Sequence, residues 1–269
     1  MNSIASLTAL EILDSRGWPT IKTTCTLSDG TRAAASIPSG RSTGAAEACE
    51  LRDGDPARYR GKGCRQAVAN VNTVLHQAVR GRSFAGQHEL DQALVDLDGS
   101  VNKQRLGANA LLSVSIAYAR ARAAQQNLPL FNHFSRLIED QVDQPARFPR
   151  LTINLFSGGR HAGKQVAIQD VLIVPSAARS IDESLVMMNA IYHAAADQTY
   201  ARYGMRLLTA DEGGLAPPFE NSETMLQAAV AAIEAAGLQP GRDAHLALDV
   251  AASHFYRDGR YQLDGRSLT

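Results

Sequence analysis

Cysteine and aromatic residues are scarce in this sequence of 269 residues, and neither sign of charge dominates it. The three cysteines are an odd and sparse set whose spacing fits neither a zinc site nor a redox pair, which indicates a reduced, cytoplasmic compartment. Lys plus Arg number 27, and Asp plus Glu also number 27. With no basic excess, we expect no nucleic-acid surface.

Long apolar runs are also missing. No stretch approaches the roughly 20 apolar residues that a membrane-spanning helix needs, so we expect no membrane span. The first residues carry no basic segment of the kind that begins a signal peptide. A composition of 45% hydrophobic and 20% charged residues suits a globular protein of one large or two ordinary domains.

The first 138 residues show β signals followed by helical ones. Residues 20–27 are rich in β-branched side chains and meet residues 31–37 through Asp29-Gly30, which predicts a hairpin. The glycine-rich segment 38–47 reads as a loop. Helical patterns then cover residues 65–80, 87–97 and 107–127.

Residues 139–150 are polar and carry two prolines, so we predict a domain boundary there, with domains at 1–138 and 139–269. The pattern then changes to apolar, strand-like segments separated by helical ones, which favours a largely parallel sheet or part of a barrel. The predicted strands are 151–155, 167–175 and a buried 245–250, the helices are 182–203 and 222–236, and a hairpin covers 255–263.

Carboxylates stand at the ends of three strand-like segments. They are Asp170, the adjacent pair Asp211-Glu212, and Asp249. In barrels and open α/β sheets such positions line the functional rim. Converging carboxylates can hold Mg²⁺ or act as general acid and base. Each pattern taken alone also fits an ordinary turn or a capped strand end.

Two loops rich in small residues are further candidates. The segment SGGRHAGK places His161 among glycines that let backbone approach a ligand, although a surface-loop histidine is the simpler interpretation. The segment PSGRSTG, which holds Ser39 and Gly40, could cradle a phosphate or a metal, or be a plain loop.

Together these stretches resemble the enolase family, in the family's order and over nearly the whole chain. The matching stretches are EILDSRGWPT, PSGRSTGAAEACELRDGD, LGANALLSVSIAYARA, SGGRHAGKQVAIQD, DEGGLAPPFEN and LALDVAASHFY. The resemblance implies an α/β protein with a small α+β N-terminal domain. The first part of an enolase-type barrel (ββααβ) follows, and the barrel is incomplete, shortened at the C-terminus.

The resemblance also implies an activity, the Mg²⁺-dependent interconversion of 2-phosphoglycerate and phosphoenolpyruvate by a homodimer. Enolase-superfamily sites use a Lys or His base, with one or two Mg²⁺ ions stabilising the ene-diolate. Matching the family's motifs assigns proton donation to Glu212 and a second catalytic carboxylate to Asp170. It assigns substrate contacts to His161, Gln169, Ser39 and Gly40, and metal ligation to Asp249 and Ser39.

The sequence departs from the family pattern at several positions. Arg41 and Arg160 replace small residues, Ala210 replaces glycine, His254 replaces glutamate, and Asp170 is one methylene shorter than the usual glutamate. The family's base lysine and two further metal carboxylates would lie beyond Thr269. Two alternatives to an ordinary enolase therefore stay open: a non-catalytic enolase-like interaction module, and one half of a split enzyme.

Overall fold

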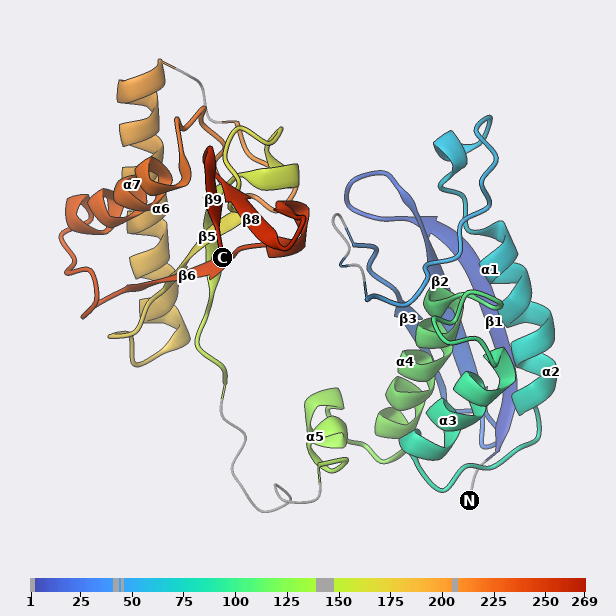
Figure 1. Ribbon diagram of the computed structural model, residues 1–269. Coiled ribbons are helices and arrows are strands. Elements are labelled where there is room, and N and C mark those ends of the chain that lie inside the picture. Colours follow the sequence, from blue (N-terminus) through green and yellow to red (C-terminus); the bar gives the residue numbers. More distant parts are fainter. Residues whose placement is uncertain (1–2, 41–43, 45, 139–147, 205–207) are drawn as a thin grey trace. The chain divides into compact units, whose positions relative to one another are not determined.

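The computed structural model describes residues 3–40, 44, 46–138, 148–204 and 208–269 (Figure 1). These fall into two compact units, one formed by residues 3–40 and 46–138 and the other by residue 44 and the described residues from 148 onward. Each unit has its own hydrophobic core. Among the described residues, no helix combines the length and the apolar character needed to cross a membrane.

The N-terminal unit is built on a three-stranded antiparallel sheet in the order β1-β2-β3. The strands are β1 (Ile4–Leu13), β2 (Pro19–Leu27) and β3 (Arg32–Ser36). The predicted hairpin is confirmed, because β2 pairs with β3 through a turn in which Gly30 has a φ of 88°. A left-handed residue at this turn is what the Asp-Gly pattern anticipates.

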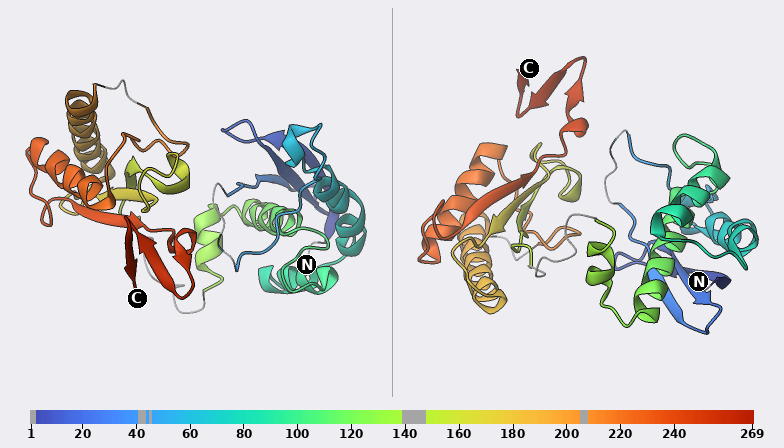
Figure 2. Two further views of the ribbon diagram at one scale, coloured as in Figure 1. Left: turned by 45° about the horizontal axis from the view of Figure 1, so that its top comes forward. Right: turned by 90° about the horizontal axis from the view of Figure 1, so that it is seen from below.

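Helices cover this sheet, and α4 (Ala108–Gln125) packs directly against β2 and β3 (Figures 1 and 2). Its small side chains allow close approach, and the buried hydroxyls of Thr23 and Ser113 meet at 2.6 Å between strand and helix. The predicted helix at 65–80 is present but contains a π-helical turn. The helical segments are α1 (Arg65–Asn70), η2 (Val71–Leu75), α2 (His76–Val79), α3 (Gln87–Asp98), α4 (Ala108–Gln125) and α5 (Leu130–Ser135), with a short η1 (Tyr59–Gly61) before them.

The second unit follows the expected ββααβ order. It comprises β4 (Ile153–Ser157), β5 (Asp170–Val174), α6 (Ile181–Tyr203), α7 (Ser222–Ala235) and β6 (His245–Asp249). The described residues contain no closed barrel, which confirms the incomplete-barrel fold class. Of the two arrangements that the sequence pattern favoured, part of a barrel is confirmed, and a largely parallel sheet was wrong. Strand β5 runs antiparallel to both neighbours, so only β4 and β6, which do not touch, share a direction.

Helices α6 and α7 begin where the sequence places capping residues. The Ser180 hydroxyl accepts a hydrogen bond from the Glu183 N–H, and the Asn221 side chain accepts one from Thr224 N–H. These caps satisfy amides that have no partner inside the helix. The two helices pack against each other, and both contribute to the core beneath β4 and β5.

Strand β6 is not the buried strand that its apolar sequence predicts. It lies at the edge of the sheet, and Leu248 is 44% exposed. An apolar run does not distinguish a central strand from an edge strand that has no neighbour. Beyond it, β7 (Tyr256–Arg257), β8 (Arg260–Leu263) and β9 (Arg266–Leu268) form a small antiparallel sheet, which confirms the hairpin at Asp258-Gly259 (Figure 2).

A partly buried ion pair ties the N-terminal sheet to the loop before α1. The carboxylate of Glu11 on β1 pairs with the Arg58 guanidinium and accepts a hydrogen bond from Cys64 N–H. The hydrogen bond from Arg58 is the main reason that the pKa of Glu11 lies below its ordinary value of 4.5, and the Cys64 bond lowers it further. Because the folded-state pKa is depressed, this stabilisation is complete above the unfolded value and is lost on acidification.

We therefore expect Glu11→Gln to flatten the pH dependence of folding of this unit. Wild-type stability should fall more steeply than that of the variant as the pH drops below about 4.5. The single tryptophan, Trp18, belongs to this unit, so its fluorescence during urea unfolding reports the unfolding of the N-terminal unit. Asp96→Asn, on the exposed side of α3, is the control. Equal acid sensitivity of wild type and Glu11→Gln would contradict the assignment.

Candidate functional site

Three polar residues meet in a row across one edge of the second sheet. Ser157 ends β4 and pairs with Asp170, which begins β5, and Asp170 pairs in turn with Asp249 at the end of β6. Residues directly opposite one another in antiparallel strands project to the same face of the sheet. The register therefore brings together one hydroxyl and two carboxylates whose positions in the sequence range from 157 to 249.

Asp170 is fixed in a buried position, with 2% of its surface exposed. Its Oδ1 accepts hydrogen bonds from the Ser157 hydroxyl at 2.7 Å and from the Asn154 side-chain amide at 2.8 Å. A buried carboxylate is costly unless it is hydrogen-bonded or paired, and both donors come from the neighbouring strand β4. Its second oxygen, Oδ2, lies 3.0 Å from Nδ1 of His161.

His161 stands in the short helix η4 (Gly159–His161), and only 2% of its side chain is exposed. The surface-loop interpretation of this histidine was therefore wrong. The preceding glycines let the loop fold against the chain leading into β5, because a Cβ on Gly158 would lie 2.4 Å from the Ile168 carbonyl oxygen. The ring is turned so that neither nitrogen makes a regular hydrogen bond with the described residues, although Asp170 lies close to Nδ1.

Glu212 approaches the other side of the same imidazole. Its Oε1 lies 3.7 Å from His161 Nε2, and 51% of its side chain is exposed. The loop that carries Glu212 is tied to β4, since Leu215 N–H donates to the Leu155 carbonyl and Ser157 N–H donates to the Leu215 carbonyl. The Gly213 carbonyl also accepts a hydrogen bond from the Tyr192 hydroxyl on α6. These bonds hold an exposed acid beside a buried histidine.

Gln169 and Asp249 form a second contact at this edge. The Gln169 side-chain amide donates to Asp249 Oδ2 at 2.9 Å, while Gln169 itself is 3% exposed. Asp249 is exposed. A buried amide thus orients a carboxylate that a ligand can reach. One region of the second unit therefore holds five of the predicted site residues, namely His161, Gln169, Asp170, Glu212 and Asp249.

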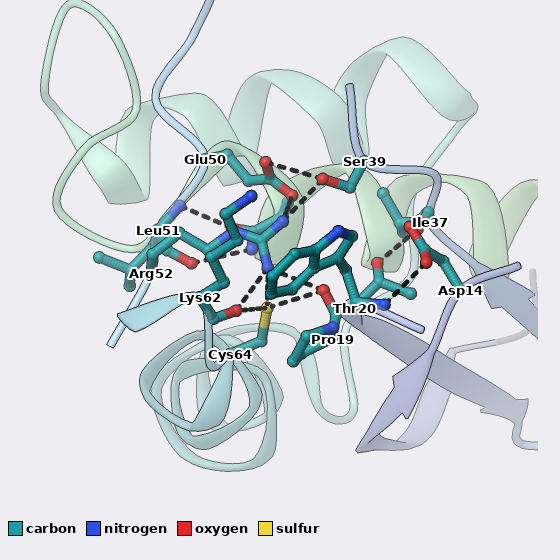
Figure 3. A network of polar contacts seen from close by, with 12 residues as sticks. Asp14, Pro19, Thr20, Ile37, Ser39, Glu50, Leu51, Arg52, Lys62 and Cys64 are labelled. Carbon is teal, nitrogen blue, oxygen red and sulfur yellow. Dashed lines mark hydrogen bonds and ion pairs between the residues drawn. The ribbon is translucent and has the colours of Figure 1, made fainter. Parts of the chain in front are cut away.

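Ser39 and Gly40 belong to the N-terminal unit, so their part in the site stays a prediction. The Ser39 hydroxyl donates to Glu50 and accepts from Arg52 at 2.7 Å, within the network of Figure 3. Arg52 also contacts Cys64, whose pKa is raised to about 11 chiefly by burial. A thiol with so high a pKa is protonated at neutral pH and is a poor nucleophile.

The departures from the family pattern lie beside these residues where the structure describes them. Arg160 directly precedes His161 in η4, and His254 ends η5 (Ala252–His254), just after β6. Burial lowers the pKa of His254, and the positive charge of Arg160 lowers it further. Arg41 lies outside the described residues. Among the described replacements, Arg160 thus adds a positive charge next to His161.

One ligand atom from each of His161, Asp170 and Glu212 lies within 4.8 Å of the other two, so these side chains form a group that could hold a metal ion. It is the one such group of three found in the part of the chain that the structure describes. An imidazole between two carboxylates is also suited to moving or holding a proton. The geometry alone allows both kinds of chemistry.

Sequence reasoning missed the residues that position Asp170. Asn154 is a polar residue inside an apolar strand, and that contrast was the available signal. Ser157 gave little signal, because a serine before two glycines is ordinary loop chemistry. Gly214 passes close to both of them, and a Cβ there would lie 2.4 Å from Ser157 Oγ and 2.6 Å from Asn154 Oδ1.

The fold and the site define a two-unit α/β protein whose acids and histidine gather at one edge of a barrel-type sheet. Comparison with protein families agrees with this class. A family model described as the enolase N-terminal domain matches residues 4–134, and one described as the enolase C-terminal TIM barrel domain matches residues 146–268. The chain belongs to the enolase family.

The close approach at Gly214 predicts that a methyl group there is harmful. Gly214→Ala should destabilise the second unit by about 1–3 kcal/mol, as overpacking of a tight site does, because Ser157 or Asn154 must move off Asp170. Calorimetric unfolding measures the change. Gly86→Ala is the matched control, since nothing lies within 4 Å of a Cβ added there. If the two substitutions cost the same, the packing around Asp170 is looser than described.

Proposed function

We propose that the protein acts in the reversible dehydration of 2-phosphoglycerate to phosphoenolpyruvate. The observation that supports this best is the approach of Glu212 to buried His161, which Asp170 holds from the other side. This places a solvent-accessible carboxyl group at the rim, beside a ring whose position is fixed. Membership of the enolase family supports the same reaction.

In the proposed reaction Glu212 is the proton donor. The bond between C3 and its hydroxyl oxygen breaks, the oxygen takes the proton of the Glu212 carboxyl group, and water leaves. The C2 proton passes to a base, and its electron pair forms the double bond between C2 and C3. By resemblance that base is a lysine, to which the matching stretches assign no position in this sequence. A positioned acid or base contributes about 10²–10⁴ to the rate of such a step.

His161 and Gln169 are proposed to contact the substrate. Both side chains are buried yet retain polar atoms without a hydrogen-bond partner among the described residues, namely the ring nitrogens of His161 and Oε1 of Gln169. Buried polar atoms are normally satisfied, so unpartnered ones point to a missing ligand. Asp170 is then proposed to have two roles. It is a catalytic carboxylate of the site, and it is the group that orients His161.

Asp249 is proposed to ligate Mg²⁺, together with Ser39 of the PSGRSTG segment. The residues in the second unit fit a cation, because Asp249 stands directly opposite Asp170 on one face of the sheet. Like charges facing each other across strands are destabilising, and a divalent cation would relieve this. When bound, Mg²⁺ would stabilise the negative charge that develops on the substrate. We further propose a cytoplasmic homodimer.

The decisive measurement is turnover of 2-phosphoglycerate with Mg²⁺, followed by the ultraviolet absorbance of phosphoenolpyruvate. The protein should be expressed with whatever sequence follows Thr269 in its reading frame, and in parallel as the present chain supplemented with the remaining part of an enolase barrel. We expect Glu212→Gln to lower kcat by about 10²–10⁴ while substrate binding persists.

Glu234→Gln is the matched control, since this exposed glutamate on α7 undergoes the same change of charge outside the site. Near-normal kcat for Glu212→Gln would refute its assignment as proton donor. Absence of turnover in every form, with 2-phosphoglycerate still bound, would favour the non-catalytic enolase-like alternative. Turnover only after addition of the second half would favour a split enzyme.

A further inference from the structure

We infer that the outer edge of β6 is a docking surface for the β6 strand of a second copy of this chain. The two strands run antiparallel across a twofold axis at Ala247, and they join two sheets of three strands each into one continuous sheet. The inference gives a surface to the homodimer proposed above, and on that point it rests on the proposed function. It does not depend on the dehydration reaction.

The two edges of the second sheet end differently. Along β4, the backbone of Leu215 exchanges hydrogen bonds with Leu155 and Ser157, so that edge is covered. Among the described residues, β6 has a single strand neighbour, β5. Its sequence, HLALD, contains neither proline nor lysine, which commonly prevent pairing at sheet edges. The β6 edge is therefore open to a further strand.

One face of β6 brings apolar side chains to this open edge. Leu246 packs against the core of the second unit, and Leu248, two residues further on, projects to the same face. Leu248 is largely exposed. When two copies pair about Ala247, Leu246 of each copy stands directly opposite Leu248 of the other. The pairing therefore removes exposed apolar surface from water, which favours association.

The other face of β6 selects the register and the partner. His245 and Asp249 flank Ala247 at equal distances along the strand, and both are exposed. Opposite residues of antiparallel strands share a face, so a register centred on Ala247 places His245 of each copy opposite Asp249 of the other. An imidazole then meets a carboxylate at both ends of the junction. Registers centred on Leu246 or Leu248 break both pairs.

Contacts within the sheet already orient these two polar side chains. The Ser176 hydroxyl lies 2.6 Å from Nδ1 of His245, and the Gln169 amide donates to Oδ2 of Asp249 at 2.9 Å. The second polar atom of each side chain, Nε2 or Oδ1, is the one that we assign to the partner copy. Oriented side chains lose little conformational entropy on docking. The second copy thereby contributes an imidazole beside Asp249, at the edge of the candidate site.

The geometry closes at two copies. A contact between identical strands about a twofold axis uses the β6 edge of both copies. The segment around Leu215 covers the β4 edge, so no equivalent edge is left for a third copy to extend the sheet in the same way. The structure therefore predicts a dimer rather than a growing fibre.

The test is sedimentation velocity of the purified chain over a range of concentrations, in which we expect a reversible dimer. His245→Asp places like charges opposite each other at both ends of the junction, so it should weaken dimerisation about 10-fold or more. Adding Asp249→His to that variant exchanges the two partners, restores both pairs and should recover most of the loss. His193→Asp, at an exposed position on α6, is the matched control. Circular dichroism checks that each variant is folded.

A position-specific cross-link gives a second measurement that involves no change of charge. Opposite Cβ atoms in antiparallel strands lie about 4.5–5.5 Å apart, so Ala247→Cys brings two thiols together on the twofold axis. The variant is made together with Cys49→Ser, because the other two cysteines are buried. A short bis-maleimide reagent should convert it into a covalent dimer. Ala190→Cys, exposed on α6, should stay monomeric under the same treatment.

A monomeric chain, or equal dimer affinity of the His245→Asp and His193→Asp variants, would overturn the inference. It would equally be overturned if the exchanged double variant stayed as weak as His245→Asp alone. A dimer that ignores all these changes would refute the surface and leave the proposed homodimer standing. Loss of dehydration in a dimer with the expected behaviour would count against the proposed reaction alone, because sedimentation requires no turnover.

Discussion

The arrangement of the site depends on one buried carboxylate. Asp170 is almost wholly enclosed, and an ionised group in that position needs partners. The register of β4 and β5 supplies Ser157 and Asn154 on one oxygen, and the loop after β4 brings His161 to the other. Removal of any of these partners would leave charge or polar atoms uncompensated, so the strands, the loop and the histidine are constrained together.

Enclosed and solvent-exposed side chains lie close together in the site. Asp170 and His161 are enclosed by backbone packed through glycines, whereas Glu212 and Asp249 reach solvent on loops and strand ends that buried neighbours hold in place. Proton transfer and metal binding both need this combination, since a group must be accessible to its ligand and yet hold a defined direction.

The N-terminal unit organises its charged residues differently. Arg52 is the centre of a network in which its guanidinium contacts Ser39, Glu50 and the carbonyl oxygens of Pro19 and Lys62 (Figure 3). In this network the Arg52 guanidinium is paired with the Glu50 carboxylate, and its contact with the Ser39 hydroxyl holds Ser39 in place. At the candidate site of the second unit, polar atoms of His161 and Gln169 have no hydrogen-bond partner among the described residues, so a ligand would supply one.

The sequence by itself determined the order of strands and helices in the second unit, both hairpin turns, and the family, because these depend on local patterns and on long ordered motifs. It also identified Asp170, Glu212, Asp249 and His161 as candidates. Only the tertiary structure decided that β5 runs antiparallel, that β6 is an exposed edge, and that His161 is buried between Asp170 and Glu212. Strand direction, edge position and burial are set by contacts between segments far apart in the chain, so a local pattern cannot specify them.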